Sequence, residues 1–440
     1  MATRLRVNCA AFLLLLCAQA AQAILPIEHW RSESGARVLF VANRGLPMLD
    51  VSVEFPAGAA FDGADRTGVA GLTNSLMRLG ASGLSEAQIE QRLADNGAVL
   101  GSRFDSDRSG YSLRTLSDPR WRLEPLQLMA AILATPEFPQ SVLERERARL
   151  SASLRESERL PATIASREFQ RAVFASHPYG RRAFEIETLD SIGRDDLIAF
   201  HRRHFVAERA VVAIMGDVTR AEAEAIADQL TRGLPRGPGP AALPDPEPLA
   251  TAIQRNIAHP ATQSHILVGA PGIRRSDPDF FAMLLGNHIL GGGGFVSRIT
   301  EEVRQKRGLA YSAYSTFAPM LAAGAFTIGL QTQRDQAPEA LAVVRRTLAD
   351  FVASGPTEKE LVAARQNIVG GFPMRIDSNR KIHDHLALIG FYDLPLDYLE
   401  RFVPAIERVT AAEIRAAFAR RIDPARMVTV VVGPEAAALP

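Results

Sequence analysis

The 440-residue sequence has almost no cysteine and no excess of charge of either sign. Its two cysteines, Cys9 and Cys17, both lie within the first 23 residues, so the remainder of the chain can form no disulfide. Lysine and arginine number 50, against 49 aspartate and glutamate residues. This balance gives no support for a nucleic acid or an anionic membrane as the partner, and it indicates no other partner in their place.

Long apolar runs are also missing, apart from one near the N-terminus. Residues 1–23 have the three parts of a secretory signal: arginines at the start, an apolar run over residues 10–16 and a small-x-small cleavage site at residues 21–23. The run is too short to span a membrane. A lipoprotein signal at Cys17 is the weaker alternative, because the bulky Leu16 precedes it. We therefore predict export, which in a bacterium means the periplasm, and no membrane attachment after cleavage.

The histidines are few and poorly placed for metal binding. His201 and His204 are three residues apart, but two arginines lie between them and would repel a cation. His383 and His385 are expected on different faces of a helix and have basic neighbours. His177 precedes a proline in a loop and is expected to be structural. The chain beyond residue 23 therefore offers no metal site that we would predict.

One segment, from the glycine run at residues 291–294 to Tyr311, points to chemistry rather than to packing. Four glycines in a row form a backbone that turns sharply or lets another group approach closely. Apolar residues at helical spacing follow over Phe295–Arg304, and Leu309–Phe317 has the composition of a strand. Arg304 and Tyr311 are therefore expected to converge. A phosphate-binding loop is excluded because no Lys-Ser or Lys-Thr follows, and a tight turn with a surface arginine is the plain alternative.

Two halves of the chain repeat one another around a proline-rich connector. Residues 232–248 contain alternating prolines, which cannot hold a helix or a central strand, so we expect an extended linker between residues 24–231 and residues 249–440. Residues 205–216 align with residues 422–433 at an offset of 217 positions (216 to 433), and the same offset aligns apolar residues of the preceding helix. A register kept over a helix and the following strand indicates a duplication.

Strand-like and helix-like segments are grouped along the chain rather than strictly alternating, which favours an α+β sandwich in each half. The first half is expected to contain a half-buried strand at Val51–Phe55, an amphipathic helix at Leu84–Leu93 and a buried strand at Val211–Met215. The second half is expected to contain strands at Ile266–Ala270 and Ala325–Leu330, and helices at Leu341–Ala353 and Lys359–Val369.

A series of short motifs in a fixed order resembles the M16 (pitrilysin or insulinase-like) metallopeptidase family over nearly the whole chain beyond residue 23. The motifs are Gly58, Gly68 to Ala70, His177 to Gly180, Gly216 to Val218, Leu290 to Gly292, Arg304 with Gly308 to Tyr311, Phe372-Pro373 with Ser378-Asn379, and Leu394 to Tyr398. Each motif alone is weak, whereas their order over two homologous halves is specific. The resemblance implies two homologous M16-type α/β sandwich domains joined by the Pro-rich linker.

The resemblance also implies that this chain has lost the family's zinc site. Zinc in the family is bound by an inverted HxxEH helix, in which two histidines and a distant glutamate hold the metal and the glutamate between the histidines is the general base. The matching positions are Gly71, Asn74 and Ser75, and no carboxylate stands in the distant slot near residues 150–153. We therefore expect no zinc and no other cofactor in this chain.

The second half keeps the Arg and Tyr that the family uses on its substrate. The resemblance implies that Arg304 and Tyr311 hydrogen-bond the scissile carbonyl and stabilise its oxyanion at the zinc site of another protein. The candidate substrate-binding glycines are Gly291, Gly292, Gly293 and Gly294. Our hypothesis is a non-catalytic subunit, inactive alone, that forms a heterodimer with an HxxEH-bearing homologue carrying zinc and encloses an unfolded peptide. The alternatives are a catalytically inactive scaffold or peptide-binding protein, and, least favoured, an independent peptidase with unrecognised ligands.

Overall fold

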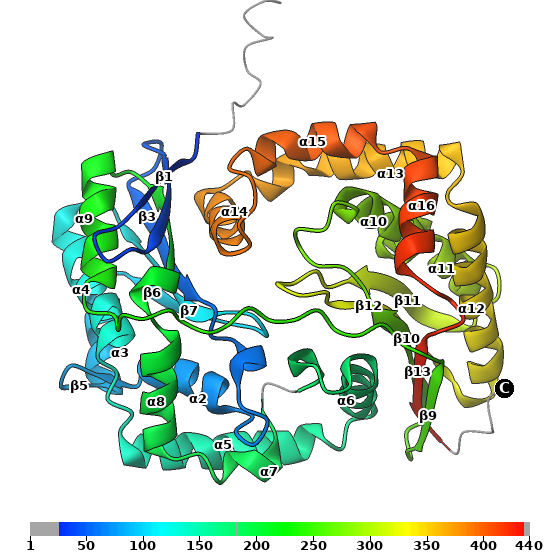
Figure 1. Cartoon of the computed structure of the whole chain (residues 1–440), viewed down its shortest axis with the longest axis horizontal. Helices are drawn as coiled ribbons and strands as arrows, with labels where there is room; N and C mark the ends of the chain where they lie inside the picture. The colour runs from blue at the N-terminus through cyan, green and yellow to red at the C-terminus, as the bar shows by residue number, and fades with distance from the viewer. Residues whose placement is uncertain (1–25, 182–183, 435–440) are drawn as a thin grey trace, which may run out of the picture.

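The computed structural model describes residues 26–181 and 184–434, so the predicted signal segment lies outside the described residues. It contains two large sheets with helices packed around them (Figure 1). The first sheet has six strands in the order β1-β2-β8-β3-β7-β6, and the second has five in the order β11-β12-β10-β13-β9. The mixture of sheets and helices confirms the predicted α+β class.

The elements of the first half are β1 (Glu28–Arg31), β2 (Arg37–Ala42), β3 (Met48–Phe55), α2 (Val69–Met77), β4 (Gly80–Ala81), β5 (Leu84–Ser85), α3 (Glu86–Asp95), β6 (Val99–Phe104), β7 (Ser109–Leu116), α4 (Pro119–Ala134), α5 (Gln140–Ser157), α6 (Pro161–Phe174), α7 (Ile186–Leu189), α8 (Arg194–His204), β8 (Val211–Gly216) and α9 (Arg220–Thr231). Between α9 and β9, residues 232–252 form neither helix nor strand.

The elements of the second half are β9 (Ile253–Ala258), β10 (Gln263–Pro271), α10 (Phe280–Asn287), α11 (Arg298–Thr300), β11 (Ala310–Phe317), β12 (Ala325–Gln333), α12 (Ala337–Ser354), α13 (Glu358–Gly371), α14 (Asn379–Phe391), α15 (Tyr398–Arg408), α16 (Ala411–Arg421) and β13 (Val428–Gly433). Each strand and helix expected in the two halves overlaps one of these elements, namely β3, α3 and β8 in the first half and β10, β12, α12 and α13 in the second.

The duplication is visible in the element bounds. Helix α8 and strand β8 in the first half have the same lengths as α16 and β13 in the second, each shifted by the predicted 217 positions. The strand orders β2-β8-β3-β7-β6 and β9-β13-β10-β12-β11 are equivalent, and β1 is the extra strand of the first sheet. The repeat therefore extends over the whole sheet topology, beyond the segment in which the sequence shows it.

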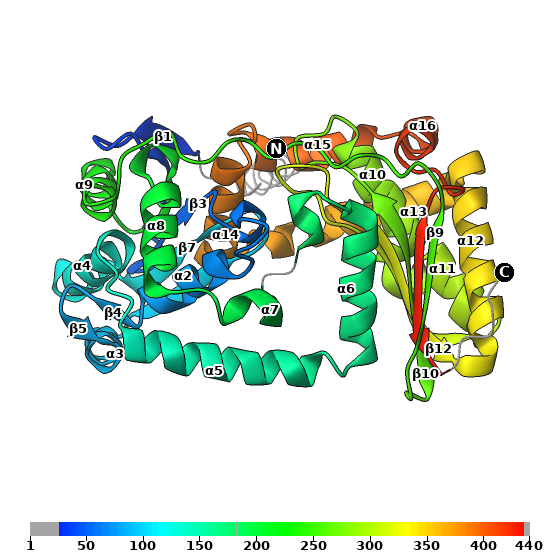
Figure 2. The same cartoon turned by 60° about the horizontal axis from the view of Figure 1, so that its bottom comes forward.

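The two halves exchange one helix each. Helix α6 of the first half packs on β10 and β13 of the second sheet, and the equivalent α14 packs on β2, β3 and β8 of the first (Figures 1 and 2). Apolar residues make both contacts: Phe169 and Val173 of α6 share a buried cluster with Val430 of β13, and Ile389 of α14 shares one with Leu39 of β2. The halves are therefore packed into one another.

The exchange corrects one prediction. The alternation in Val51–Phe55 predicts a half-buried strand, yet all five residues are buried because α14 covers the face that carries Ser52 and Glu54. Glu54 accepts a hydrogen bond of 3.0 Å from Arg108, and burial raises the pKa of its carboxyl. The part-buried guanidinium of Arg108 thus offsets part of the cost of burying the Glu54 carboxyl on this face.

His383 of α14 makes the helix exchange sensitive to acid. Its ring is 3% exposed, its Nε2 lies 3.2 Å from the carbonyl oxygen of Ala213 in β8, and burial lowers its pKa from 6.5 to about 4. The unfolded chain therefore binds a proton that the folded chain excludes between these pH values, so stability present above pH 6.5 is lost as the pH falls toward 4. The expected loss at pH 4 is about 3 kcal/mol.

The measurement is the free energy of unfolding in urea between pH 7 and pH 4, for the wild type and for His383→Gln. Glutamine keeps a donor for the carbonyl of Ala213 and does not titrate in this range. The stability of the wild type relative to the variant is expected to fall by about 3 kcal/mol between pH 7 and pH 4. Parallel pH profiles would show that His383 is not the residue that senses acid.

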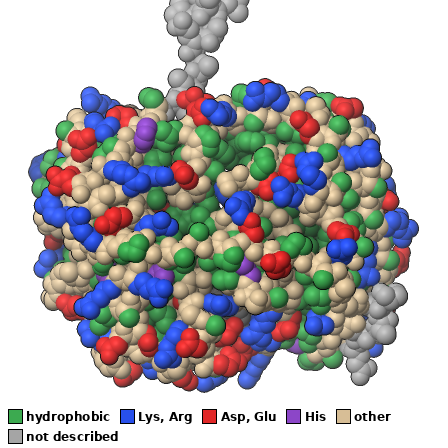
Figure 3. All heavy atoms as spheres, in the orientation of Figure 1, with side chains coloured by type: hydrophobic (Ala, Val, Ile, Leu, Met, Phe, Trp, Pro, Cys, Tyr) green, Lys and Arg blue, Asp and Glu red, His purple; other side chains and the backbone are tan. Residues whose placement is uncertain are grey.

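The surface of the molecule fits its balanced composition. Figure 3 shows basic and acidic side chains intermingled on the face in view, with apolar side chains between them. No helix within the described ranges has the length and hydrophobicity needed to cross a membrane.

Candidate functional site

The glycine run lies at a tight turn against the edge of the second sheet. It follows α10 as a π-helical turn, η4 (His288–Gly292), and a Cβ on Gly291 would lie 2.4 Å from the backbone nitrogen of Ser315 in β11. Gly294 has φ +64°, a conformation that favours glycine. A Cβ on Gly293 would lie 2.7 Å from the backbone oxygen of His288, and one on Gly292 would displace the Asn287 side chain, whose Nδ2 would lie 2.8 Å away. The run therefore has a packing reason, and its role in substrate binding stays a prediction.

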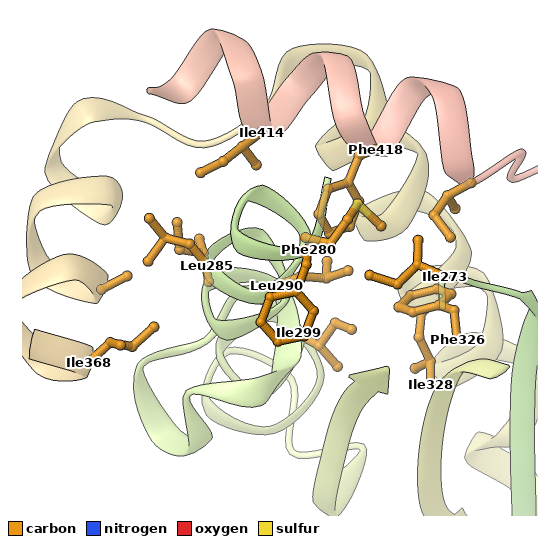
Figure 4. Packing of buried hydrophobic residues seen from close by; sticks show 14 of the residues in the cluster. Ile273, Phe280, Leu285, Leu290, Ile299, Phe326, Ile328, Ile368, Ile414 and Phe418 are labelled. Carbon is orange, nitrogen blue, oxygen red and sulfur yellow. The ribbon is translucent and has the colours of Figure 1, made fainter. Parts of the chain in front are cut away.

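The segment after the glycines is helical but not the single amphipathic helix that the sequence predicts. It consists of a 3-10 turn, η5 (Gly294–Val296), the three-residue α11 and a π-helical turn, η6 (Glu301–Gln305). Ile299 and Val303 are fully buried, so the apolar spacing is used as expected. Figure 4 shows Leu290 and Ile299 pointing into the same core as Phe326 and Phe418. This core fixes the backbone from which Arg304 projects.

Tyr311 lies at a β-bulge in an edge strand. The neighbouring residues Ala310 and Ser312 pair with the consecutive residues Thr332 and Gln331 of β12, which leaves Tyr311 without a partner. A bulge turns a side chain away from its regular direction and is frequent beside functional sites. The Tyr311 side chain is 83% exposed, whereas Tyr314 packs over Gly329 in β12.

Arg304 and Tyr311 converge as the sequence predicts. The guanidinium carbon of Arg304 lies 4.6 Å from the centroid of the Tyr311 ring and 4.7 Å from that of Phe295. No carboxylate or hydrogen-bond acceptor in the described part of the chain pairs with the Arg304 side chain, whereas Arg307 nearby is paired with Glu302 at 2.6 Å. An arginine whose N–H groups are unengaged at an exposed edge is free to bind an incoming oxygen atom.

The sequence reasoning missed Phe295. The apolar spacing predicts that it lies on the buried face of a helix, but its ring is 64% exposed and lies against Arg304. The only signal for its role is its place directly after the glycine run, because a large aromatic residue is unusual at an exposed turn.

At the positions of the zinc motif in α2, Gly71 makes a packing contact and Asn74 makes hydrogen bonds within the first half. A Cβ on Gly71 would lie 2.4 Å from Cζ of Phe184, so an aromatic ring fills the space beside the position of the first histidine. The amide of Asn74 donates to Ser109 Oγ at 2.8 Å and its oxygen accepts from Ser102 Oγ. Ser75 is exposed. These groups do not fit a zinc ion, because they offer no imidazole and no carboxylate.

The start of α2 is held by a buried carboxyl group. Asp62 accepts hydrogen bonds of 2.7 Å from the backbone N–H groups of Gly68 and Ala70. Burial raises the pKa of Asp62 to about 7, against the lowering effect of these two donors. The acid is therefore engaged with the helix terminus and is not directed at the positions of the zinc motif.

The family's distant glutamate ligand also has no counterpart in α5. Helix α5 carries no carboxylate at residues 150–153, and Glu146 is paired with Arg145 and Arg149 at 2.9 and 2.8 Å. His201 is hydrogen-bonded through Nε2 to the carbonyl oxygen of Leu133 at 2.8 Å. Over the described ranges, no group of three His, Cys, Asp or Glu residues is arranged to hold a metal ion.

Family profiles match both halves of the chain. Residues 37–185 match the profile described as insulinase (peptidase family M16), and residues 191–368 match the one described as peptidase M16 inactive domain. Together these matches cover most of the chain between β2 and α13.

Known relatives support the same assignment. The crystal structure of a peptidase M16 inactive domain from Pseudomonas fluorescens is 37% identical, has a TM-score of 0.90 and covers 94% of this chain and 100% of that one. The non-peptidase homolog YmxG of Helicobacter pylori is 25% identical over 86% of this chain and 87% of that protein. An uncharacterized zinc protease of Streptomyces coelicolor is 27% identical over 57% of this chain and 55% of that protein.

These matches agree with the geometry of α2, where Gly71 and Asn74 replace zinc-binding chemistry with packing. The chain belongs to peptidase family M16, as an inactive, M16-like member without the HxxEH motif.

Proposed function

We propose that this chain is the non-catalytic, substrate-binding subunit of a heteromeric M16 zinc peptidase. The observation that carries the proposal is the contrast between the two halves. The zinc-motif positions of the first half are filled by packing around Gly71 and Asn74. In the second half Tyr311 is exposed, and the half-buried Arg304 lies against it with no ion-pair partner among the described residues. Exposed polar groups that serve no packing role indicate a binding surface.

The chemistry of the pair suits a developing negative charge. A partner subunit with an HxxEH helix would hold the zinc ion, which supplies the attacking hydroxide. Arg304 donates from the edge of its guanidinium and Tyr311 from its phenol O–H to the carbonyl oxygen of the scissile bond. Both hydrogen bonds strengthen as this oxygen gains charge, which lowers the activation barrier.

Strand β11 offers a reason for unfolded peptides as substrates. It is the edge strand of the second sheet, and Tyr311 projects from it. The carbonyl oxygens of Ala313 and Ser315 already accept hydrogen bonds from Thr300 and Asn287, so a peptide would add at the end of the edge that carries Tyr311. A peptide added along such an edge is held by main-chain hydrogen bonds, which tolerate varied side chains. The secretory signal predicted at residues 1–23 supports a periplasmic location for this subunit, where its partner would have to be present as well.

The test measures peptidase activity on an unstructured peptide in three samples: this chain alone, the HxxEH partner alone, and the mixture of the two. Activity is expected only in the mixture. Arg304→Ala and Tyr311→Phe are each expected to lower kcat/KM at least tenfold, about 1.4 kcal/mol of transition-state stabilisation. Arg346→Ala is the control for the loss of an arginine, because Arg346 is a surface arginine of the second half that lies on α12.

Two outcomes would contradict the proposal. The partner would be equally active without this chain, or the Arg304 and Tyr311 variants would behave like the Arg346 control. In either case the remaining function is that of a scaffold or peptide-binding protein in which the pair is a relic.

A further inference from the structure

Phe295 is a large apolar residue held at the surface by specific backbone features. It follows Gly294, whose φ of +64° sets the direction of the chain. Its carbonyl oxygen accepts a hydrogen bond of 2.7 Å from Nε2 of Gln305 in η6, the same turn that carries Arg304. The ring remains 64% exposed, so burial of apolar area does not explain its position.

The ring of Phe295 is placed to hold the guanidinium of Arg304. A cation that lies over an aromatic ring is attracted to the electron-rich face, and a guanidinium favours stacking its flat face on the ring. The five N–H donors lie in the guanidinium plane and stay available. With Tyr311 at 4.6 Å and Phe295 at 4.7 Å, the cation lies over two rings, and no carboxylate of the described residues occupies its donors.

An ion pair and a ring contact have opposite consequences for function. A carboxylate beside Arg304 would neutralise the charge and compete with a substrate carbonyl for the same N–H groups. Two rings restrict the rotamers of the long side chain and leave both the charge and the donors free. Preorganised donors stabilise a transition state without a cost of reorganisation.

We propose that Phe295 is a positioning residue for Arg304, which it holds over Tyr311 with its donors directed at the substrate carbonyl. The inference rests on the proposed function, because it assigns Arg304 a role in peptide cleavage. It adds a third residue to the pair, which neither the family resemblance nor the sequence pattern assigns. The aromatic face is the required property, so the side chain at position 295 is expected to be replaceable by another aromatic residue.

The kinetic test compares Phe295→Leu with Phe295→Tyr in the mixture with the HxxEH partner. Leucine keeps an apolar side chain but has no ring, and kcat/KM is expected to fall about two- to fivefold, the size of an exposed cation–π contact. Tyrosine restores the ring and is expected to restore activity. Val296→Ala is the control, because Val296 is the adjacent residue and is 78% exposed.

A double-mutant cycle separates positioning from a general structural effect. In the Arg304→Ala background, Phe295→Leu is expected to cause no further loss, because the residue that it positions is gone. A structural effect on the loop would lower activity by the same factor in both backgrounds. Additive losses, or a leucine variant as active as the tyrosine variant, would overturn the positioning role.

A measurement on this chain alone makes the two proposals separable. The Nε–Hε NMR resonance of Arg304, assigned by its absence in Arg304→Ala, is expected upfield because of the ring currents. Phe295→Leu is expected to move it downfield, and Val296→Ala is expected to leave it in place. An unmoved resonance overturns the ring contact whatever the enzyme kinetics show. If Arg304→Ala does not affect cleavage, the proposed function fails and the positioning role fails with it.

Discussion

Residues 26–248, produced without the second half, are expected to fail to fold. The first sheet buries Leu39, Val211 and Met215 against α14, which belongs to the second half. In return, α6 of the first half buries Phe169 and Phe174 against the second sheet. Removal of the second half exposes all of these side chains, at a cost on the order of 10 kcal/mol. This equals the whole stability of a typical domain.

The measurement is far-UV circular dichroism with thermal unfolding of the truncated chain. Residues 249–434 alone serve as the reciprocal case, because they lose α6 in the same way. Co-expression of the two halves as separate chains is the control, and it is expected to give a folded complex because each helix again finds its sheet. A cooperative transition of either half alone would show that the exchanged helices do not hold the fold together.

The helix exchange lies outside what one sequence reveals. The spacing of apolar residues predicts which face of a helix is buried, but it does not say which sheet covers that face. The duplication could be predicted because it depends on a register between two segments of the same chain. The covering of Ser52 and Glu54 by α14 could not, because an alternating strand has the same pattern whether its polar face meets water or buried charges.

The sequence predicts the convergence of Arg304 and Tyr311, but it does not predict the bulge at Tyr311 or the contact of Phe295. Arg304 and Tyr311 were expected to converge because a glycine at 308 ends the helical segment just before the strand, and this glycine has φ +63°. The bulge at Tyr311 depends on the register of β11 against β12, which is a tertiary property. The contact of Phe295 depends on the 3-10 turn that replaces the expected helix start. Local backbone breaks of this kind override helical periodicity.

Among the polar residues that join the two halves, Asp107 is expected to contribute most to the stability of the fold. It lies in the turn between β6 and β7, is fully buried, and accepts hydrogen bonds from the backbone N–H of Leu321 at 2.8 Å and the hydroxyl of Tyr392 at 3.1 Å. The hydroxyl of Tyr179 also donates to it. One carboxyl group thus joins the first half to the end of α14 and to the turn between β11 and β12.

Asp107→Ala removes the acceptor of one buried donor, Tyr179, and of two part-buried donors, Leu321 and Tyr392, and is expected to lower the free energy of unfolding by about 3 kcal/mol. Arg37→Ala is the matched control, because Arg37 also bridges the halves, through an ion pair of 2.6 Å with the exposed Asp393. Exposed pairs of this kind contribute about 1 kcal/mol or less. Urea denaturation of both variants gives the comparison. Equal losses would mean that the exchanged helices alone fix Arg304 and Tyr311 relative to the first half, and that the buried polar network contributes no more than a surface contact.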